Sequence, residues 1–574
     1  MRHFIRNQPG RQAWVWHALA LCVLAITGYT NAATKAKPAT RQPNVVVLFP
    51  DNMRGQAMGC MGNPNVHTPN IDRLASQGIL FPQTFANAPE CTLARAIMLT
   101  GKYPHINGVV ANDLRLRDSQ VTIAELLVEE GYRTGFIGKW HLDGGSHLGF
   151  TPPGPRRQGF QFWAANEAVH ANYRSLYFRD DPTPIPITKY EPEVWTDLAI
   201  EFMRGTKKDQ PFFLMIGTAP PGPPHKLGGR VAPEKYLNMY DPAALTMRPN
   251  FKGVVHPLQA AATLKAIGRE MDQYRSFDHV ADGAPFTPAG IMQLAHAIQE
   301  KGFLEDIQQN GREELAGYYA AITAIDDQVG RLMQTLDELG IAEDTIFVFT
   351  SDHGNLMGSH EVSFVMQHMK PWDEVVRVPG IVRYPRKVKA GQQLDTLFSL
   401  ADLAPSLLAL CGTQVPKDMQ GTDLSEIILG RETEGPNSVY FSQPTGWQGG
   451  KGGEHGGWRG VRTDRYMYVS WPDKPRLLYD MEKDPYQLNS LVGNPEYAAV
   501  QKELDQKLQQ WMQQTGDSWK YNWTPHEGYE PIQDLGRLYT GHGSKQPFYS
   551  VDQYFKWAAE NPDLVPKKDP YDLK

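Results

Sequence analysis

A cysteine and an arginine, Cys91 and Arg95, are the side chains in this sequence best suited to chemistry on an anion. They lie four residues apart where a loop gives way to a predicted helix over 94–100, so both would share one helix face. The start of that helix would offer unpaired N–H groups and a positive dipole end to an anionic substrate. The alternative is an ordinary buried cysteine beside a surface arginine, because free cysteine is among the most buried residue types.

Two polar pairs, Asp51-Asn52 and Asp352-His353, could bind a metal ion. Each pair follows a short apolar run that is typical of a buried strand. Hard cations such as Ca²⁺ prefer oxygen ligands, and the imidazole leaves Mn²⁺ or Mg²⁺ open as well. Taken singly, each pair could equally be a turn or a helix cap. Taken together, they predict a small cage for a divalent cation.

Several basic side chains could neutralise a bound anion and the charge that develops on it. Lys139 and His141 stand one residue apart, directly after a predicted strand and a glycine. An isolated histidine or lysine is usually structural, so this close spacing is more informative than either residue alone. The basic candidates are Arg95, Lys139, His141, His225 and Lys370.

The elements that must position these residues alternate between strands and helices. Apolar runs predict strands over 44–49, 131–138 (with its turn), 211–219 and 345–350, and apolar periodicity predicts helices over 71–78, 94–100, 121–130 and 318–339. This order predicts an α/β fold with a large, mostly parallel central sheet and helices on both faces. Ligands of such sheets bind at the carboxyl ends of the strands. Since Asp51, His141, His225 and Asp352 all follow predicted strands, we expect one shared site.

The pattern changes after about residue 430. Short strands over 458–463, 466–469 and 477–480 predict an antiparallel sheet, and a helix over 495–514 would pack on it. We therefore divide the chain into a catalytic domain over 44–430, a smaller antiparallel-sheet subdomain over 431–515, and an aromatic-rich extension over 516–574. The catalytic domain would carry a long polar insert over 241–311.

The N-terminus has the features of an export signal. Residues 1–32 combine a basic leader with a short apolar run and a small-residue end, and a linker over 33–43 follows. An uncleaved anchor is the alternative for this segment. No later apolar run is long enough to cross a bilayer, so we expect no stable membrane span. The protein is expected to be exported, to a periplasmic or extracellular destination.

The net charge bears on the kind of partner, and the cysteine count bears on disulfide pairing. Removal of residues 1–32 takes away three arginines and no acidic residue, so the net charge falls from −6 to −9. We therefore expect no nucleic acid among the partners. The cysteines that remain are Cys60, Cys91 and Cys411, too few for a disulfide framework. Cys60 and Cys411 could pair or could stay as buried free thiols.

The motifs that carry these residues resemble those of the type I sulfatase family, within the alkaline-phosphatase-like superfamily. The nucleophile motif Cys91-Thr92-Leu93-Ala94-Arg95 lies between the two metal-ligand pairs, and the matches continue in order over roughly 44–515. The resembling segments are 44–52, 68–74, 91–105, 131–141, 224–225, 350–354, 370–379, 402–406, 461–466 and 478–480. Single motifs of this set are weak, whereas the ordered set is specific.

The resemblance implies a mechanism and a role for each residue. In this family a maturation enzyme oxidises the motif cysteine, here Cys91, to formylglycine; one hydroxyl of the hydrated aldehyde, bound to the metal, attacks sulfur and the other then expels sulfate. The implied metal ligands are Asp51, Asn52, Asp352, His353 and residue 91. The implied roles of the basic residues are charge stabilisation by Arg95 and Lys139, proton removal by His141, and contact with the sulfate and the leaving alcohol by His225 and Lys370.

The chain departs from the family pattern at two positions. Leu93 stands where the family usually has proline or alanine, at a position that the maturation machinery reads. Asn52 stands where a second aspartate is usual, which lowers the negative charge of the cage. Asn166 and His170 lie where relatives often bring a further polar residue to the substrate.

The leading hypothesis is a secreted sulfatase that acts on a sulfated sugar or polysaccharide. The insert 241–311 and the aromatic extension could line glycan subsites or could only cover the fold. One alternative is a phosphonate monoester or phosphodiester hydrolase of the same superfamily. The other is an inactive homologue that only binds sulfated glycans, which the two departures would explain.

Overall fold

An eight-stranded sheet is the frame on which the residues around Cys91 are arranged. The computed structural model describes residues 42–144, 149–170, 172–173, 175–222, 231–254, 304–360, 368–444, 457–472 and 474–519, and the backbone of 538–539 and 545–546. The strands, in spatial order, are β11 (Gln392–Gln393), β2 (Ile79–Leu80), β10 (Ile381–Arg383), β9 (Thr345–Phe349), β1 (Asn44–Leu48), β8 (Phe212–Gly217), β4 (Arg133–Lys139) and β5 (Phe162–Asn166). Only the pairings of β10 are antiparallel, so the predicted mostly parallel sheet is confirmed.

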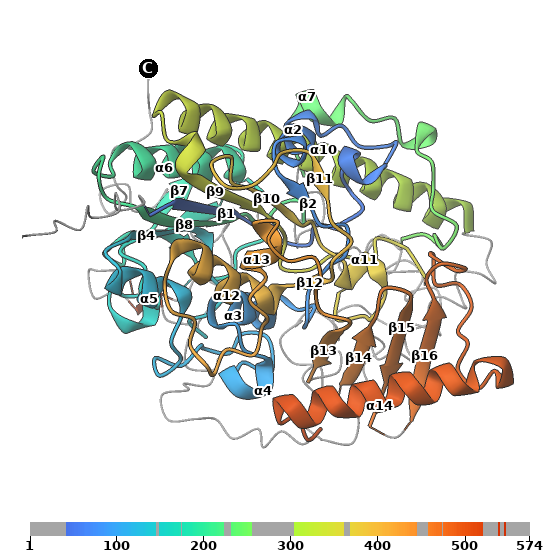
Figure 1. The fold of residues 1–574 in the computed structure, drawn as a ribbon. Coiled ribbons are helices and arrows are strands. Elements are labelled where there is room, and N and C mark those ends of the chain that lie inside the picture. Colours follow the sequence, from blue (N-terminus) through green and yellow to red (C-terminus); the bar gives the residue numbers. More distant parts are fainter. Residues whose placement is uncertain are drawn as a thin grey trace, which may run out of the picture. The chain divides into compact units, whose positions relative to one another are not determined.

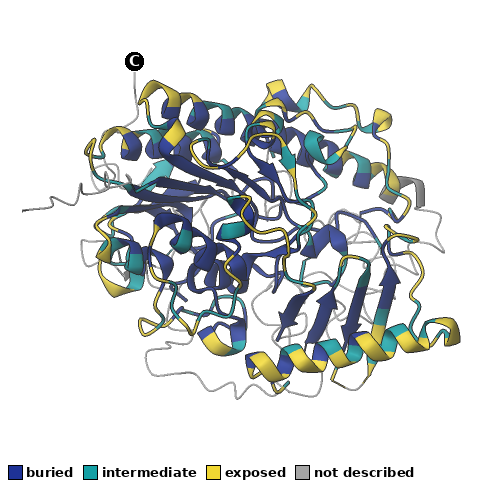
Figure 2. Ribbon diagram, viewed as in Figure 1, coloured by how far each residue is buried: buried dark blue, intermediate teal, exposed yellow. Residues whose placement is uncertain are grey.

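Helices cover both faces of this sheet, as the fold class requires. In β1, Val45 and Val47 pack into one core cluster, and Val46 and Leu48 pack into the other. A strand buried on both faces needs apolar residues at every position, which explains the unbroken run. Figure 1 shows the helices, which are α3 (Cys91–Thr100), α5 (Ile123–Glu129) and α12 (Leu400–Cys411) on the first face, and α2 (Pro69–Ser76), α6 (Glu191–Arg204) and α10 (Leu304–Glu338) on the second. Helices α2, α5, α6 and α10 are buried on their inner sides and partly exposed on their outer sides (Figure 2). Helix α3 is buried along its whole length, and α12 almost so.

The predicted elements occur close to the expected positions, with instructive differences. The helix expected over 318–339 begins earlier, at Leu304, and the helix expected over 94–100 begins at Cys91 itself. Helices α6 and α12 were not predicted. Most of the insert 241–311 and of the extension 516–574, and all of residues 1–32, lie outside the described residues.

A separate four-stranded antiparallel sheet follows, as the sequence predicts. Its strands are β13 (Val439–Gln443), β14 (Trp458–Arg462), β15 (Tyr466–Ser470) and β16 (Pro475–Asp480), paired in that order. Helix α14 (Ala498–Thr515) lies against the sheet (Figure 1), and its Asp505 accepts a hydrogen bond of 2.9 Å from the Tyr468 hydroxyl. Only β13 was not expected from the sequence.

The second sheet supports the segment that leads into α3. The side-chain amide of Asn87 donates to the Tyr440 carbonyl at 2.9 Å, and the Ser442 N–H donates to the Asn87 carbonyl at 2.8 Å. The Gln443 amide donates to the Glu90 carboxyl group at 2.7 Å, and Glu90 is the residue before the first turn of α3. Strand β13 therefore helps to fix the position of Cys91.

Glu90 makes this support sensitive to pH. Burial raises the pKa of its carboxyl group from the ordinary 4.5 to about 8, against the opposing hydrogen bond from Gln443. The folded protein therefore holds a proton that the unfolded chain releases above pH 4.5, so stability falls as pH rises from 4.5 to 8, at about 1.4 kcal/mol per pH unit from this group.

We expect Glu90→Gln, which carries no charge at any pH, to remove this loss. The variant should match the parent protein in thermal unfolding at pH 4.5 and exceed its midpoint temperature at pH 8. Glu130→Gln, at an exposed glutamate, is the matched control and should leave the pH dependence as it was. Equal pH dependence in the Glu90 variant and the parent would contradict the prediction.

Two further sequence observations concern the membrane and the cysteines. Among the helices of the described residues, none is both long and apolar enough to span a membrane. Cys60 and Cys411 are free thiols, the first half-buried and the second buried. They pack with opposite faces of the large sheet, since Cys411 belongs to the core cluster around α3 and Cys60 borders the other one.

Candidate active site

The ends of neighbouring strands bring the predicted site residues together. Asp51 follows β1, Asp352 follows β9 and Lys139 is the last residue of β4. The Asp51 N–H donates to the Thr218 carbonyl beyond β8 at 2.9 Å, and the Asn52 N–H donates to the Asp352 carboxylate at 3.2 Å. The carboxyl ends of these strands thus form one buried polar site, as the topology of a parallel sheet favours.

Four potential metal ligands meet at Cys91. One donor atom each from Asp51, Cys91, Asp352 and His353 lies within 4.8 Å of all the others, and all four residues are buried. The Cys91 sulfur is 3.2 Å from the Nε2 atom of His353 and 3.9 Å from Oδ1 of Asp51. Residues 300 positions apart in the chain therefore share a single space a few ångströms wide.

Arg95 binds both aspartates at once. Its Nη2 atom lies 3.0 Å from Oδ2 of Asp51 and 2.8 Å from Oδ2 of Asp352, and its Nε also donates to Asp352 at 3.0 Å. Nη1 donates to the Lys139 carbonyl. Arg95 is only 3% exposed, so it is not the surface arginine of the alternative interpretation. A planar guanidinium suits this task because its donors are fixed in a fork.

Lys139 places a second positive charge beside the Asp51 carboxylate. Its Nζ atom is 2.7 Å from Oδ2 of Asp51 and 2.7 Å from the Nε2 atom of His170. Burial alone would raise the pKa of Asp51, but the nearby positive charges, those of Lys139, His170 and Arg95 first among them, outweigh it and hold the pKa well below its usual value. Asp51 therefore stays ionised within the core.

The pKa values of Asp352 and of the Cys91 thiol are shifted upward, opposite to that of Asp51. Burial, and then the charge of Asp51, raise the pKa of Asp352. The same two causes raise the pKa of the Cys91 thiol well above its usual value. Two carboxylates in one buried space are costly without a compensating charge, and a divalent cation would supply that charge.

The donor set fits a divalent metal. The His353 Nδ1 atom lies 2.9 Å from the Gly354 carbonyl, so the N–H points there and the Nε2 lone pair faces Cys91. Metal-ligating histidines are commonly held in this way. Asn52 has its amide nitrogen toward Asp51 and its oxygen 3.1 Å from the amide of Asn355, so rotation of the amide is needed for its oxygen to serve as a ligand.

His141 is linked to the start of α3 through the carboxylate of Asp113. Its Nε2 atom is 2.6 Å from the Asp113 carboxylate, and the Asp113 N–H donates to the Thr92 hydroxyl at 3.1 Å. Asp113 therefore connects His141 to the residue after Cys91. Nothing in the sequence pattern singled out Asp113, which lies in a loop outside the motifs.

The remaining predicted residues divide into three cases. The backbone of Met369, next to the half-buried Lys370, donates to the Pro89 carbonyl at 2.9 Å, which places Lys370 close to the segment before Cys91. Asn166 holds its own loop by a bond of 3.1 Å to the Leu176 carbonyl. His225 lies outside the described residues.

One histidine at the site was missed. The rings of His353 and His368 stack with their centroids 4.5 Å apart, and donor atoms of Cys91, His353 and His368 lie within 4.8 Å of one another. The available signal was the proximity of His368 to Lys370 in the sequence.

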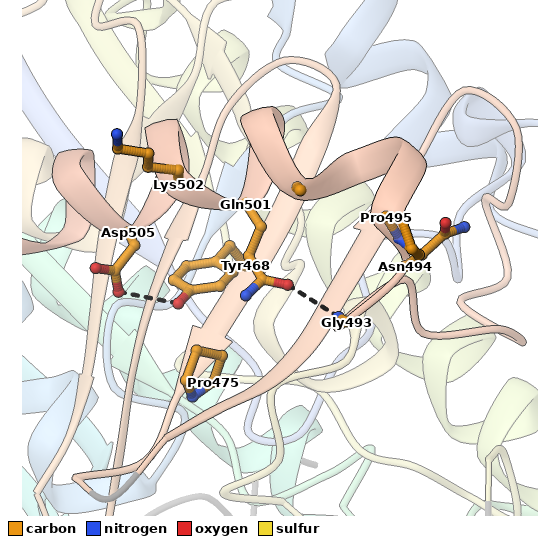
Figure 3. A pocket seen from close by; sticks show the side chains of 9 residues that line it. Tyr468, Pro475, Gly493, Asn494, Pro495, Gln501, Lys502 and Asp505 are labelled. Carbon is orange, nitrogen blue, oxygen red and sulfur yellow. Dashed lines mark hydrogen bonds between the residues drawn. The ribbon is translucent and has the colours of Figure 1, made fainter.

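A pocket of about 340 Å³ lies elsewhere, on the second sheet. Tyr468 and Pro475 line it from the sheet, and Gln501, Lys502 and Asp505 line it from α14 (Figure 3). Its polar groups bind one another, since Tyr468 donates to Asp505 and the Gly493 N–H donates to Gln501 at 3.1 Å. No lining residue belongs to the group around Cys91, so this pocket is separate from the candidate active site.

Comparison with known proteins agrees with this geometry. The sulfatase family model matches residues 43–413, and a model described as N-sulphoglucosamine sulphohydrolase, C-terminal, matches 364–514. The chain is 34% identical to an ulvan-active sulfatase of Formosa agariphila, over 83% of each chain. It is 30% identical to an N-acetylglucosamine-6-O-sulfatase of Bacteroides thetaiotaomicron, over 87% of this chain and 91% of the relative.

A solved structure of a complex shows the same similarity in three dimensions. It contains a protein with its substrate D-glucosamine-2-N,6-O-disulfate and superposes with a TM-score of 0.66 at 26% identity, over 83% of this chain and 99% of the other. Strand ends, buried carboxylates and the Cys91–Arg95 segment at a helix start thus occur together with a family match over most of the chain. The protein belongs to the sulfatase family and is a sulfuric ester hydrolase.

Proposed function

We propose that the protein hydrolyses sulfate esters of a sulfated sugar or polysaccharide, with residue 91 as the nucleophile after oxidation to formylglycine and with a bound divalent metal, Ca²⁺ in the first instance. The observation that carries the proposal is the group of Asp51, Asp352 and His353 around Cys91, within 4.8 Å. The names of two relatives refer to ulvan and to an N-acetylglucosamine 6-O-sulfatase, and this supports a sulfated sugar as the substrate.

A modified residue 91 and a bound metal would supply the reacting groups. A hydrated aldehyde at residue 91 would supply two hydroxyl groups, one to attack sulfur and one whose deprotonation expels sulfate. The metal would supply positive charge at the attacking oxygen and the sulfate. Asp51, Asn52, Asp352 and His353 are the residues proposed to hold the metal, together with residue 91.

The residues of the chain itself would fix and protonate the reactants. Arg95 orients both carboxylates through its fork, and Lys139 lies beside them with its charge already in place. We assign proton removal from residue 91 to His141, which Asp113 holds at 2.6 Å. Protonation of the leaving alcohol is assigned to His225 and Lys370.

The departures from the family pattern bear on maturation. Leu93 is fully buried in the core cluster around α3, so a large apolar residue has a packing role at this position. We propose that a formylglycine-generating enzyme still converts Cys91, and that residues 1–32 direct export. Mass spectrometry of the tryptic peptide 74–95 detects the conversion as the mass loss from thiol to aldehyde. A thiol that persists when the maturation enzyme is co-expressed would contradict this part.

The substrate class is tested with the purified, matured protein. We expect release of sulfate from an aryl sulfate, and from ulvan or N-acetylglucosamine 6-sulfate, with no comparable turnover of an aryl phosphonate monoester or phosphodiester. Turnover of the phosphorus esters alone would assign the chain to the other hydrolases of the superfamily. Binding of sulfated glycans by the matured protein without hydrolysis would instead identify an inactive homologue.

A further inference from the structure

We propose that the chain has a second metal-binding state before residue 91 is oxidised, in which Cys91, His353 and His368 bind Zn²⁺. The donors would be one sulfur and two imidazole nitrogens, and a water molecule would complete the tetrahedron, as in other zinc sites with three protein ligands. This is a tetrahedral set that zinc sites in proteins use, and it differs in chemistry from the oxygen-rich set of the matured enzyme.

The spacing of the donor atoms fits such a site. Zinc bonds of about 2.3 Å to sulfur and about 2.0 Å to nitrogen, at a tetrahedral angle, hold these two atoms about 3.5 Å apart. The observed distance from the Cys91 sulfur to Nε2 of His353 is 3.2 Å. Small side-chain rotations therefore suffice to place a metal between them.

The second imidazole is positioned by its neighbour. The rings of His353 and His368 are inclined by only 12° with centroids 4.5 Å apart, and the donor atoms of both lie within 4.8 Å of the sulfur. His353 also donates its Nδ1–H to the Gly354 carbonyl at 2.9 Å, which leaves Nε2 as its ligand atom. An imidazole nitrogen binds a metal in the plane of its ring, so the two nearly parallel rings cannot face one ion as they lie. Rotation of the His368 side chain is needed to bring its nitrogen to the ion, and the donor atoms are already within 4.8 Å of one another.

The thiol form and the formylglycine form of residue 91 differ in the softness of the ligand atom that they offer to a metal. Thiolate and imidazole ligands select Zn²⁺ over Ca²⁺ and Mg²⁺, whereas carboxylate and hydroxyl oxygens favour the hard ions. Binding of Zn²⁺ replaces the thiol proton of Cys91, which passes to solvent. Oxidation to the aldehyde removes the sulfur, so maturation would exchange a soft-metal site for a hard-metal site at the same place.

The test uses the full-length protein produced without the maturation enzyme, with the thiol at residue 91 confirmed by mass and metals removed by chelation. Titration with Co²⁺, the usual spectroscopic substitute for Zn²⁺, should give one equivalent of a sulfur-to-cobalt charge-transfer band that Zn²⁺ then displaces. Cys91→Ser should abolish the band, and His368→Ala should weaken Zn²⁺ binding at least about tenfold, since even outer-shell changes cost that much.

Matched controls separate this site from adventitious binding. Cys60→Ser removes the half-buried thiol outside the cluster and His67→Ala removes an exposed histidine, and both should leave band and affinity unchanged. Absence of the charge-transfer band in the parent thiol protein would overturn the proposal, whether or not the variants fold. So would unchanged affinity in a folded His368→Ala. The readout needs no hydrolysis, so it stands apart from the test of sulfatase activity.

Discussion

Substitution of Cys91 by serine is expected to eliminate sulfate ester hydrolysis and leave the fold intact. The side chain is the first in α3 and touches two of the proposed metal ligands, so the reacting atoms must be attached there. Loss of a hydrolase nucleophile lowers kcat on the order of 10⁶-fold. Serine keeps the size of the side chain, but it cannot reform an aldehyde to expel sulfate and would stop after one transfer.

The measurement compares matured parent protein with the variant on an aryl sulfate, and follows thermal unfolding in parallel. Cys60→Ser is the matched control, because it changes another cysteine to serine outside the group around Cys91 and should keep full activity. Multiple turnovers by Cys91→Ser at a rate near that of the parent would show that residue 91 is not the nucleophile. A single sulfate retained on the serine would instead support the proposed exit step.

Local patterns were sufficient to predict the strand-end residues of the site. Asp51 and Asp352 each follow an apolar run, and a strand buried on both faces leaves that pattern in any sequence. Lys139 ends a more mixed strand, RTGFIGK, which a preceding turn and its Phe-Ile core made recognisable. The edge of the sheet at which they meet follows from the parallel arrangement. Both the fold class and the meeting of these residues could therefore be predicted.

Contacts between distant segments could not be predicted in the same way. The bond from Asn87 to Tyr440 spans 353 residues, and neither residue lies in a pattern that names its partner. Arg95 was expected to act on the nucleophile and the sulfate, but its described hydrogen bonds join two aspartates and the Lys139 carbonyl. Such partners are set by the packing of α3 on the sheet, which a single sequence does not encode locally.

Arg95→Ala is expected to have the second large effect, on activity and on stability together. The guanidinium of Arg95 binds the carboxylates of both Asp51 and Asp352. Its removal leaves the ammonium group of Lys139, which binds Asp51, as the cation described next to them. Breaking a buried ion pair in this way costs about 3–5 kcal/mol of unfolding free energy. Displaced carboxylates should also lower turnover by at least about 10³-fold, as the loss of a preorganised charge does.

Arg95→Lys distinguishes the two contributions. A lysine restores the charge but lacks the fork that reaches both carboxylates, so we expect it to recover much of the stability and little of the turnover. Urea unfolding gives the first quantity, and kcat/KM on an aryl sulfate gives the second. Arg73→Ala, at an exposed arginine of α2, should change neither. If lysine restored both to the level of the parent, charge alone would explain Arg95, and the fixed spacing of its donors would have no role in catalysis.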